Sequence, residues 1–418
     1  MYWKEGSEVT AANGTKIAGA RSGGEITGLT NDKAYSVLVR ANKVGFTSID
    51  SDVKTATPSE IIRYSITGSG TAFTARKGGA AVGEAEKPIQ DVITAIRTDA
   101  AGKAVNIQFG DGTAALETGT AALAFNNTGG AWGAVTLSGK LTSTLSGTTG
   151  TISIGGDVSV TSTADITNNS GRPINNASTG TLNITEGTIL TVYSTAVYNS
   201  STGKIIVSGT AKVTSQSTNT SSGTIHIASS GTATEDRLII EGGSVENTNP
   251  AGFYAITSAS TGGIRISGGT VSATGGRAVH STSVGKITVS GTALLTSGNI
   301  NTAGGVVYLA AISGVTSTAE RLVIEGGTIR NTAVGNAVYN ASTGTVTMSG
   351  GTVENTSETT GNAIYNNSTG AINITGGTVS KTGTGGNAIF NNSTGVVTIT
   401  KPPAVITGNV SGVPGYTP

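Results

Sequence analysis

Apolar and polar residues alternate in short stretches along most of the chain, and each stretch is followed by glycine, asparagine, serine or threonine. The segment STGTVTMSGGTVENTSETTGNAIYNN begins at residue 342, and related segments begin at residues 368 and 393, so the steps are 26 and 25 residues. Period-two alternation predicts β-strands. Repetition at such an interval predicts a solenoid, in which each repeat packs on its neighbours.

An apolar-x-apolar core marks the repeat unit along the chain. From Leu182 onward its steps are 23, 33, 26, 23, 35, 24, 26 and 25 residues, and the two long steps carry extra loops near 228–236 and 310–320. RLIIEGGSVENT at 237–248 matches RLVIEGGTIRNT at 321–332, which indicates that blocks of three units were duplicated. The core occurs at Ile152/Ile154, Leu182/Ile184, Ile205/Val207, Leu238/Ile240, Ile264/Ile266, Ile287/Val289, Leu322/Ile324, Val346/Met348, Ile372/Ile374 and Val397/Ile399.

The residue types within each unit favour strands and turns. Valine, isoleucine and threonine dominate the alternating stretches, and the chain has 63 glycines that can adopt positive φ in turns. Three short strands in a unit of about 25 residues are typical of a right-handed parallel β-helix, whose coils lie about 4.8 Å apart. We therefore predict an all-β solenoid of about eleven coils over residues 111–400.

The N-terminal segment 1–58 lacks the repeat and resembles part of a fibronectin type III domain. Leu29 precedes Tyr35 by six residues, the spacing of that family's tyrosine corner, and SVLVRANKVG at 36–45 resembles its F strand and turn. YWKEG near the start would be the C strand and VKTATP at 53–58 the G strand, whereas the A and B strands have no counterpart. We expect a partial module in a fragment of a longer protein.

Residues 59–110 are expected to link this module to the solenoid and to cap it. A short amphipathic helix is predicted over 88–99, because the apolar residues after Pro88 have helical spacing: Ile89, Val92, Ile93 and Ile96. A helix followed by a GKAVNIQF strand resembles the N-terminal cap of pectin-lyase-like β-helix proteins, which covers the apolar end of the first coil. Residues 401–418 lack the repeat and are expected to form a C-terminal cap or linker.

The third strand of each unit allows its phase to be predicted. One position is aliphatic in every coil and is expected to face the core. Two positions later come Asn199, Asn340, Asn366 and Asn391, which are expected to point inward and bond along the helix axis. The position between them should face outward. It holds Tyr198, His226, Thr257, His280, Tyr308, Tyr339, Tyr365 and Phe390.

This outward column, Thr257 excepted, is the candidate ligand-contact surface. Flat rings in a line can stack on the sugar rings of an extended polysaccharide or a host or cell-surface glycan. The alternative interpretation is that the rings pack on one another and stiffen an exposed sheet. The two histidines lie two coils apart and have no carboxylate neighbours in sequence, so no metal site is predicted.

Composition and the placement of acidic residues narrow the range of possible functions. A net charge of +1 with 12% charged residues gives no sign of a nucleic-acid partner, and no apolar run is long enough to insert into a membrane. Pectin-lyase-like enzymes use clustered Asp residues. Here the acidic residues are isolated, so we predict no catalytic residues and no cofactor. They include Asp111, Asp157, Glu186, Glu241, Glu246, Glu325 and Glu354.

The sequence as a whole resembles repeat-rich bacterial surface proteins that carry fibronectin type III modules. That resemblance implies a non-enzymatic, extracellular β-helix at the bacterial cell surface, which acts in adhesion or carbohydrate contact and is monomeric as a fragment. A structural spacer or stalk that displays neighbouring domains is the main alternative. A pectin-lyase-like polysaccharide-degrading enzyme is the second alternative.

Overall fold

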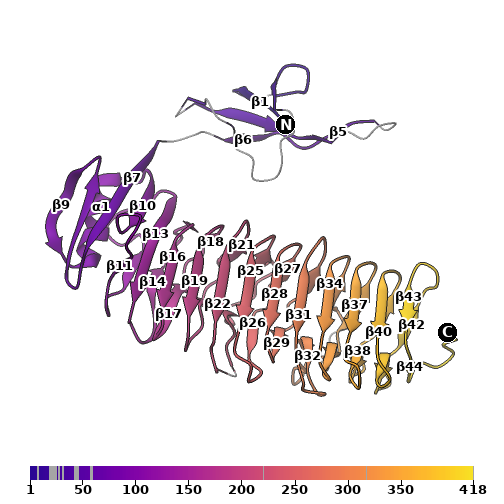
Figure 1. Cartoon of the computed structure of the whole chain (residues 1–418). Helices are drawn as coiled ribbons and strands as arrows, with labels where there is room; N and C mark the ends of the chain where they lie inside the picture. The colour runs from indigo at the N-terminus through magenta and orange to yellow at the C-terminus, as the bar shows by residue number, and fades with distance from the viewer. Residues whose placement is uncertain are drawn as a thin grey trace. The chain divides into compact units, whose positions relative to one another are not determined.

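A computed structural model of the 418-residue chain describes residues 1–6, 9–17, 26, 29–30, 33–41, 47–56, 60–219, 221–316 and 318–417, the side chains of residues 41 and 49 excepted. The chain forms two compact units, Met1–Ile62 and Arg63–Pro418. Strands dominate both units, and α1 (Ile89–Ala100) is the one α-helix of the described residues (Figure 1).

The described residues of the N-terminal unit form six short strands: β1 (Tyr2–Glu5), β2 (Thr15–Lys16), β3 (Tyr35–Leu38), β4 (Arg40–Ala41), β5 (Ile49–Asp50) and β6 (Lys54–Ala56). Four of them form an antiparallel sheet in the order β2-β1-β3-β6. Tyr35 is buried against the Trp3 ring at 5.5 Å, and its hydroxyl accepts a hydrogen bond from the Thr30 backbone N–H at 3.0 Å. Segments 42–46 and 57–59, which would complete the expected F-strand turn and G strand, lie outside the described residues.

The second unit contains a parallel β-helix, which confirms the fold class predicted from the repeats. Each coil contributes one strand to each of three ladders, and the ladders run side by side along the solenoid (Figure 1). The third ladder has twelve strands, one more than the roughly eleven coils that the repeat count predicts. Equivalent residues of successive coils are therefore direct neighbours.

The three ladders have the following strands, and β13 takes part in both the first and the second. The first ladder holds β10 (Ala104–Phe109), β13 (Val135–Ser143), β15 (Val160–Ser162), β18 (Thr181–Ile184), β21 (Lys204–Val207), β24 (Leu238–Ile240), β27 (Ile264–Ile266), β30 (Ile287–Val289), β33 (Glu320–Ile324), β36 (Thr345–Met348), β39 (Ile372–Ile374) and β42 (Val397–Ile399). The second holds β11 (Leu116–Glu117), β13, β16 (Asp165–Asn168), β19 (Thr188–Thr191), β22 (Lys212–Ser215), β25 (Ser244–Asn247), β28 (Thr270–Ala273), β31 (Leu294–Ser297), β34 (Thr328–Asn331), β37 (Thr352–Asn355), β40 (Thr378–Lys381) and β43 (Val405–Thr407). The third holds β12 (Leu123–Phe125), β14 (Gly147–Ile154), β17 (Gly171–Asn176), β20 (Val197–Asn199), β23 (Ile225–Ile227), β26 (Tyr254–Ser258), β29 (Arg277–Ser281), β32 (Gly305–Leu309), β35 (Asn336–Asn340), β38 (Asn362–Asn366), β41 (Asn387–Asn391) and β44 (Val410–Ser411).

Stacked aliphatic side chains fill the solenoid interior. In the second ladder one fully buried column runs through Ile166, Ile189, Val213, Val245, Val271, Leu295, Ile329, Val353 and Val379. The turns between the first and second ladders need glycine. At Gly243, φ is +67° and an added Cβ would lie 2.3 Å from the Ala211 carbonyl oxygen of the preceding coil. Coils stack this closely only because the turn residue has no side chain.

Buried asparagines form a polar ladder at the end of the third-ladder strands, as predicted. Asn340 donates from Nδ2 to Asn366 Oδ1 at 3.0 Å, and Asn366 donates to Asn391 Oδ1 at 3.0 Å. Asn366 also donates to the Gly370 carbonyl at 3.0 Å, which closes the following turn. Each amide thereby satisfies buried polar groups in its own coil and in a neighbouring coil.

Two sequence assignments differ from the structure. Ile152 and Ile154 lie in β14 of the third ladder, not in the first. The first-ladder strand of that coil is β15, where Ser162 takes the inward place that an apolar residue has in the other coils, so the apolar-x-apolar pattern is absent. The segment 401–418 also continues the solenoid, because β43 pairs with β40 and β44 pairs with β41.

The N-terminal end of the solenoid is covered by α1 and three further strands. The helix lies where the apolar spacing predicts it and packs against β8 (Ala72–Lys77), β9 (Ala80–Lys87) and β12. Ile89, Val92, Ile93 and Ile96 are buried in this contact region. The antiparallel strands β7 (Ile61–Ser69), β8 and β9 belong to the cap as well, which the helix pattern alone does not predict.

The long loops pack over corners of the solenoid, and each also contacts a first-ladder strand: Asp236 lies 3.4 Å from Arg265 Nε in β27, and the Thr318 carbonyl accepts from Thr345 Oγ1 in β36 at 2.8 Å. In the 228–236 loop, the Ala233 N–H donates to Thr261 Oγ1 at 2.9 Å, in the turn after β26. In the 310–320 loop, the Val315 carbonyl accepts a hydrogen bond from Thr343 Oγ1 at 3.3 Å, in the turn after β35. Of the outward aliphatic side chains Ile206, Ile239 and Val323, Ile239 alone is buried.

Replacing Asn366 by alanine should lower the free energy of unfolding by about 1–3 kcal/mol, because the Asn340 amide and the Gly370 carbonyl lose their partner inside the coil. Asn373→Ala is the matched control, since Asn373 occupies a half-buried outward position one strand later and should cost less than about 0.5 kcal/mol. Urea unfolding followed by circular dichroism measures both. Equal losses for the two variants would contradict a stabilising ladder.

Candidate functional site

The predicted outward column exists as a continuous row on the third ladder. Tyr198 pairs in register with His226, and the row continues residue by residue to Phe390. The preceding position in these strands is fully buried in every coil from Val197 to Ile389. Because side chains alternate across a strand, the row lies on the outer surface of the coil. The sequence thus predicted its register correctly.

The rings of this row lie on one another, so their faces are turned along the solenoid. Tyr308 and Tyr339 stack with centroids 5.2 Å apart and planes at 15°, and Tyr339 and Tyr365 stack at 4.9 Å and 4°. Phe390 then meets Tyr365 edge-on at 5.2 Å. Tyr339 has neighbours on both faces and is 6% exposed. The stacked rings of Tyr308, Tyr339 and Tyr365 therefore offer edges and hydroxyl groups to solvent, and the faces between them are not available as the flat platform that sugar stacking requires.

Two arginines that the sequence analysis did not identify complete the stacking. Arg172 in β17 covers the Tyr198 ring at 3.8 Å, and Arg277 in β29 covers the Tyr308 ring at 3.7 Å. Arg277 pairs in register with Tyr254, two positions before the aliphatic column. The next coil has Gly305 at the corresponding position, where an added Cβ would lie 2.8 Å from the Tyr339 backbone nitrogen.

Both histidines lie in a desolvated, positively charged environment. Burial, and to a smaller extent the nearby guanidinium groups of Arg172 and Arg277, together lower the pKa of His226 and His280 to about 4. His226 Nδ1 is 2.7 Å from Thr257 Oγ1, whereas His280 Nδ1 is buried and has no hydrogen-bond partner in the part of the chain that the structure describes. Both imidazoles are neutral at pH 7 and serve as members of the stacked row. Across the part of the chain that the structure describes, no cluster of His, Cys, Asp or Glu could hold a metal ion.

The acidic residues singled out in the sequence lie apart from the row and serve structural contacts. Glu354 accepts from Arg330 Nε at 2.5 Å, and Glu246 is 3.5 Å from Lys212 Nζ, in each case across neighbouring coils. Glu241 pairs with Arg265 at 3.5 Å. Asp111 accepts three hydrogen bonds within its own turn, including the Thr113 and Ala114 backbone N–H groups, which lower its pKa to about 2. Glu186 and Glu325 are exposed.

No protein-family model, curated protein or solved structure matches this chain. Within the described ranges, no helix has the length and apolar character needed to cross a membrane.

The histidines predict a specific pH dependence of stability. Their folded pKa of about 4 lies below the ordinary 6.5, so the unfolded chain binds protons first as the pH falls. Stability is therefore full above pH 6.5 and declines toward pH 4, by on the order of 1–3 kcal/mol per imidazole. Thermal melts between pH 7 and pH 4.5 should show this decline, and H226Q/H280Q should flatten it. A parallel decline in both proteins would assign it to other groups.

Proposed function

We propose that this chain is a non-enzymatic, extracellular β-helix of the bacterial cell surface that acts as a rigid spacer and displays neighbouring domains. The observation that carries the proposal is the unbroken third ladder. Its outward row is used for contacts between coils, and its inward asparagines are used in the same way. Side chains that could have formed a binding surface are thus occupied in joining one coil to the next.

Stacked rings and amide ladders restrict bending of the solenoid. A bend would open coils on one side, and there it would separate rings held at about 5 Å and amides held at 3.0 Å. Aromatic pairs contribute about 0.5–1.5 kcal/mol each beyond their buried area. Because these contacts recur in successive coils, their resistance to bending adds along the ladder.

The N-terminal unit supports the proposal that this chain is part of a surface protein built from several domains in a row. We interpret it as a partial fibronectin type III domain, because the Tyr35 hydroxyl accepts from the Thr30 backbone N–H, the kind of contact that a tyrosine corner makes. The solenoid is interpreted as pectin-lyase-like, with α1 in the position of an N-terminal cap. The carboxylates of Glu354, Glu246 and Glu241 are each paired with an arginine or a lysine. This pairing supports a role other than polysaccharide cleavage.

Contact with a glycan is the second candidate, and it rests on the polar edge of the row. Asn367 donates to the Tyr339 hydroxyl at 2.9 Å, and Asn392 donates to Asn367 Oδ1 at 3.1 Å. Both amides are exposed, and Tyr365 and Phe390 are half-buried beside them. Alternating hydroxyls, amides and ring edges can hydrogen-bond a polysaccharide or cell-surface glycan that lies along the solenoid. Binding of this kind would be weak and almost independent of salt.

Spin labels test the rigidity of the spacer. Lys212 and Val405 are exposed and lie in one column of the second ladder, seven pairings apart. The chain has no cysteine, so K212C/V405C carries only the two labels. Double electron–electron resonance should give one narrow distance near 34 Å, and deletion of the coil 342–367 should shorten it to about 29 Å. A distribution much wider than the label arms allow would contradict a rigid spacer.

A glycan array on the whole chain decides between spacer and adhesin. If a glycan binds through the row, Y308F/Y365F should reduce its retention at least threefold, because the rings stay stacked while two hydroxyl groups are removed. Tyr193→Phe is the matched control, since Tyr193 is 73% exposed and lies outside the row. Retention that is equal in the double variant and the control would exclude the row as the glycan site. Absence of any retained glycan supports the spacer alone.

A further inference from the structure

Two buried arginines occupy matched positions in the two long coils. Arg237 begins the segment RLIIEGG and Arg321 begins RLVIEGG, and each follows one of the extra loops. Arg237 is 1% exposed and Arg321 is 3% exposed. A guanidinium is rarely buried without a charged partner, because removing it from water costs several kcal/mol. Their environments differ, and the difference points to a site at Arg321.

A β-bulge turns Arg321 inward. The pairing of β33 with β36 shifts between Glu320 and Leu322, so that Arg321 is the extra residue of the pair. Leu322 and Ile324 keep their places in the buried column, and Arg321 is buried beside them. Bulges re-aim side chains in this way and often occur next to binding sites.

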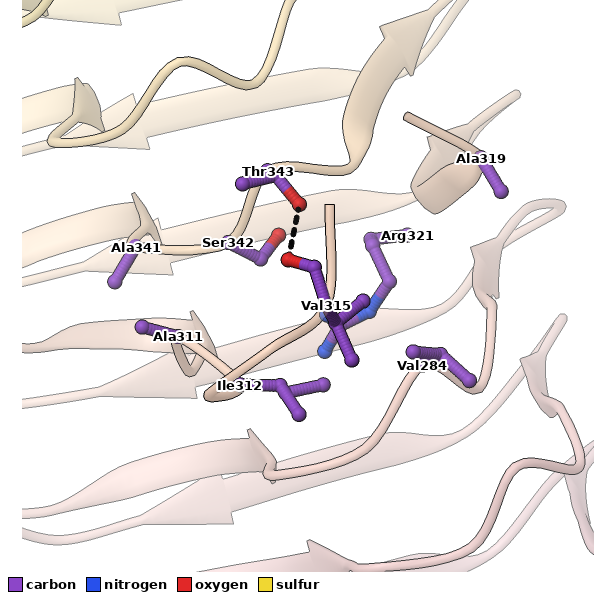
Figure 2. A pocket seen from close by; sticks show the side chains of 9 residues that line it. All are labelled: Val284, Ala311, Ile312, Val315, Ala319, Arg321, Ala341, Ser342 and Thr343. Carbon is purple, nitrogen blue, oxygen red and sulfur yellow. Dashed lines mark hydrogen bonds between the residues drawn. The ribbon is translucent and has the colours of Figure 1, made fainter. Parts of the chain in front are cut away.

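The Arg321 guanidinium borders a small cavity beneath the 310–320 loop. Figure 2 shows the side chain directed into the space between Ile312, Val315 and Val284. The cavity has a volume of about 60 Å³, more than the roughly 10–15 Å³ that one water needs. The lining of the cavity is mostly apolar and also includes Ser342 and Thr343.

Among the described residues, no carboxylate is paired with the positive charge at this cavity. Arg321 donates from Nη2 to Ser281 Oγ at 3.2 Å, while its Nε is buried without a hydrogen-bond partner among the described residues. The adjacent Glu320 is exposed and accepts from Thr347 Oγ1 at 3.0 Å. Burial lowers the pKa of Arg321 to about 10, so the group remains a cation at pH 7.

The matched Arg237 has its hydrogen bonds largely satisfied by the protein. Its Nε donates to the Gly203 carbonyl at 3.3 Å, and its Nη1 donates to Ser230 Oγ and Ser260 Oγ, each at 3.0 Å. Arg237 Nη2 is buried without a hydrogen-bond partner among the described residues, as is Arg321 Nε. The difference is that three protein oxygens contact Arg237, whereas one contacts Arg321, and Arg321 borders a cavity.

We propose that the cavity at Arg321 binds a monovalent inorganic anion of the size of chloride, bromide or nitrate. The anion would accept from Nε and lie against Ile312 and Val315. One guanidinium compensates one negative charge, so a divalent anion such as sulfate would leave a charge uncompensated in an apolar cavity. The site would fix the 310–320 loop to the neighbouring coils, and it is independent of the proposed spacer function.

Thermal melts in bromide test this site with a matched control. Bromide replaces gluconate at constant total sodium concentration and scan rate, in the parent chain, Arg321→Met and Arg237→Met. Methionine keeps an unbranched apolar side chain and removes the charge. The Tm of the parent and of Arg237→Met should rise saturably by roughly 2–5 °C once bromide exceeds its Kd about a hundredfold. Arg321→Met should lose the saturable rise.

A crystal of the parent chain soaked in bromide provides a readout that does not depend on any variant. An anomalous peak within hydrogen-bond distance of Arg321 Nε is expected, and no such peak at Arg237. Chloride-35 line broadening by the parent chain, reversed by bromide, gives the same test in solution if Arg321→Met does not fold. A cavity that contains only water, or a bromide response that is equal in Arg321→Met and the parent, would overturn the proposal.

Discussion

Stacking of equivalent residues at the spacing of a parallel sheet is the constraint on which the whole solenoid depends. Each side chain lies about 4.8 Å from its counterpart in the next coil, so every position must tolerate a copy or a near relative of itself as a neighbour. Aliphatic columns meet this condition in the interior, asparagine ladders meet it at the corners, and rings meet it outside. Charged residues meet it when the neighbour has the opposite charge, as in the Arg330–Glu354 pair, or is neutral, as Ile239 and Thr288 are beside Arg265.

The same constraint explains why the stacked rings of the aromatic row turn their faces toward one another, along the solenoid axis. Rings on neighbouring strands are close enough to stack, and stacking removes their faces from water. Tyr339 is the extreme case, with Tyr308 on one face and Tyr365 on the other. An exposed column of rings on a β-helix is therefore primarily a contact between coils. Any ligand must use what stacking leaves free, which here is hydroxyl groups, ring edges and the adjacent asparagines.

The two long coils depart most from exact repetition, and they contain buried charged groups that the stacking of equivalent residues does not explain. The long coils carry loops that no neighbouring coil copies, and beneath them lie Arg237 and Arg321, the two buried guanidinium groups. A singly occurring buried charge cannot be compensated by a ladder, so it needs local oxygens or a bound ion. Arg237 has the oxygens, whereas Arg321 borders a cavity. Both blocks contain the arginine, and Ser342 corresponds to Ser260, but Arg237 is hydrogen-bonded to Ser260 whereas Arg321 is hydrogen-bonded to Ser281.

The sequence by itself determined the fold class, the coil length, the inward and outward phase of the third strand and the position of α1. All of these follow from residue type at a fixed period, because stacked coils place one kind of residue in each column. The pattern failed where a polar residue took an inward place, as Ser162 did, and at the end of the chain, where β43 and β44 add a coil without the repeat. Only the tertiary structure decided the tilt of the rings, the arginines laid over them and the cavity at Arg321. These depend on side-chain torsions, on a bulge and on loop packing between coils, which no column of residue types specifies.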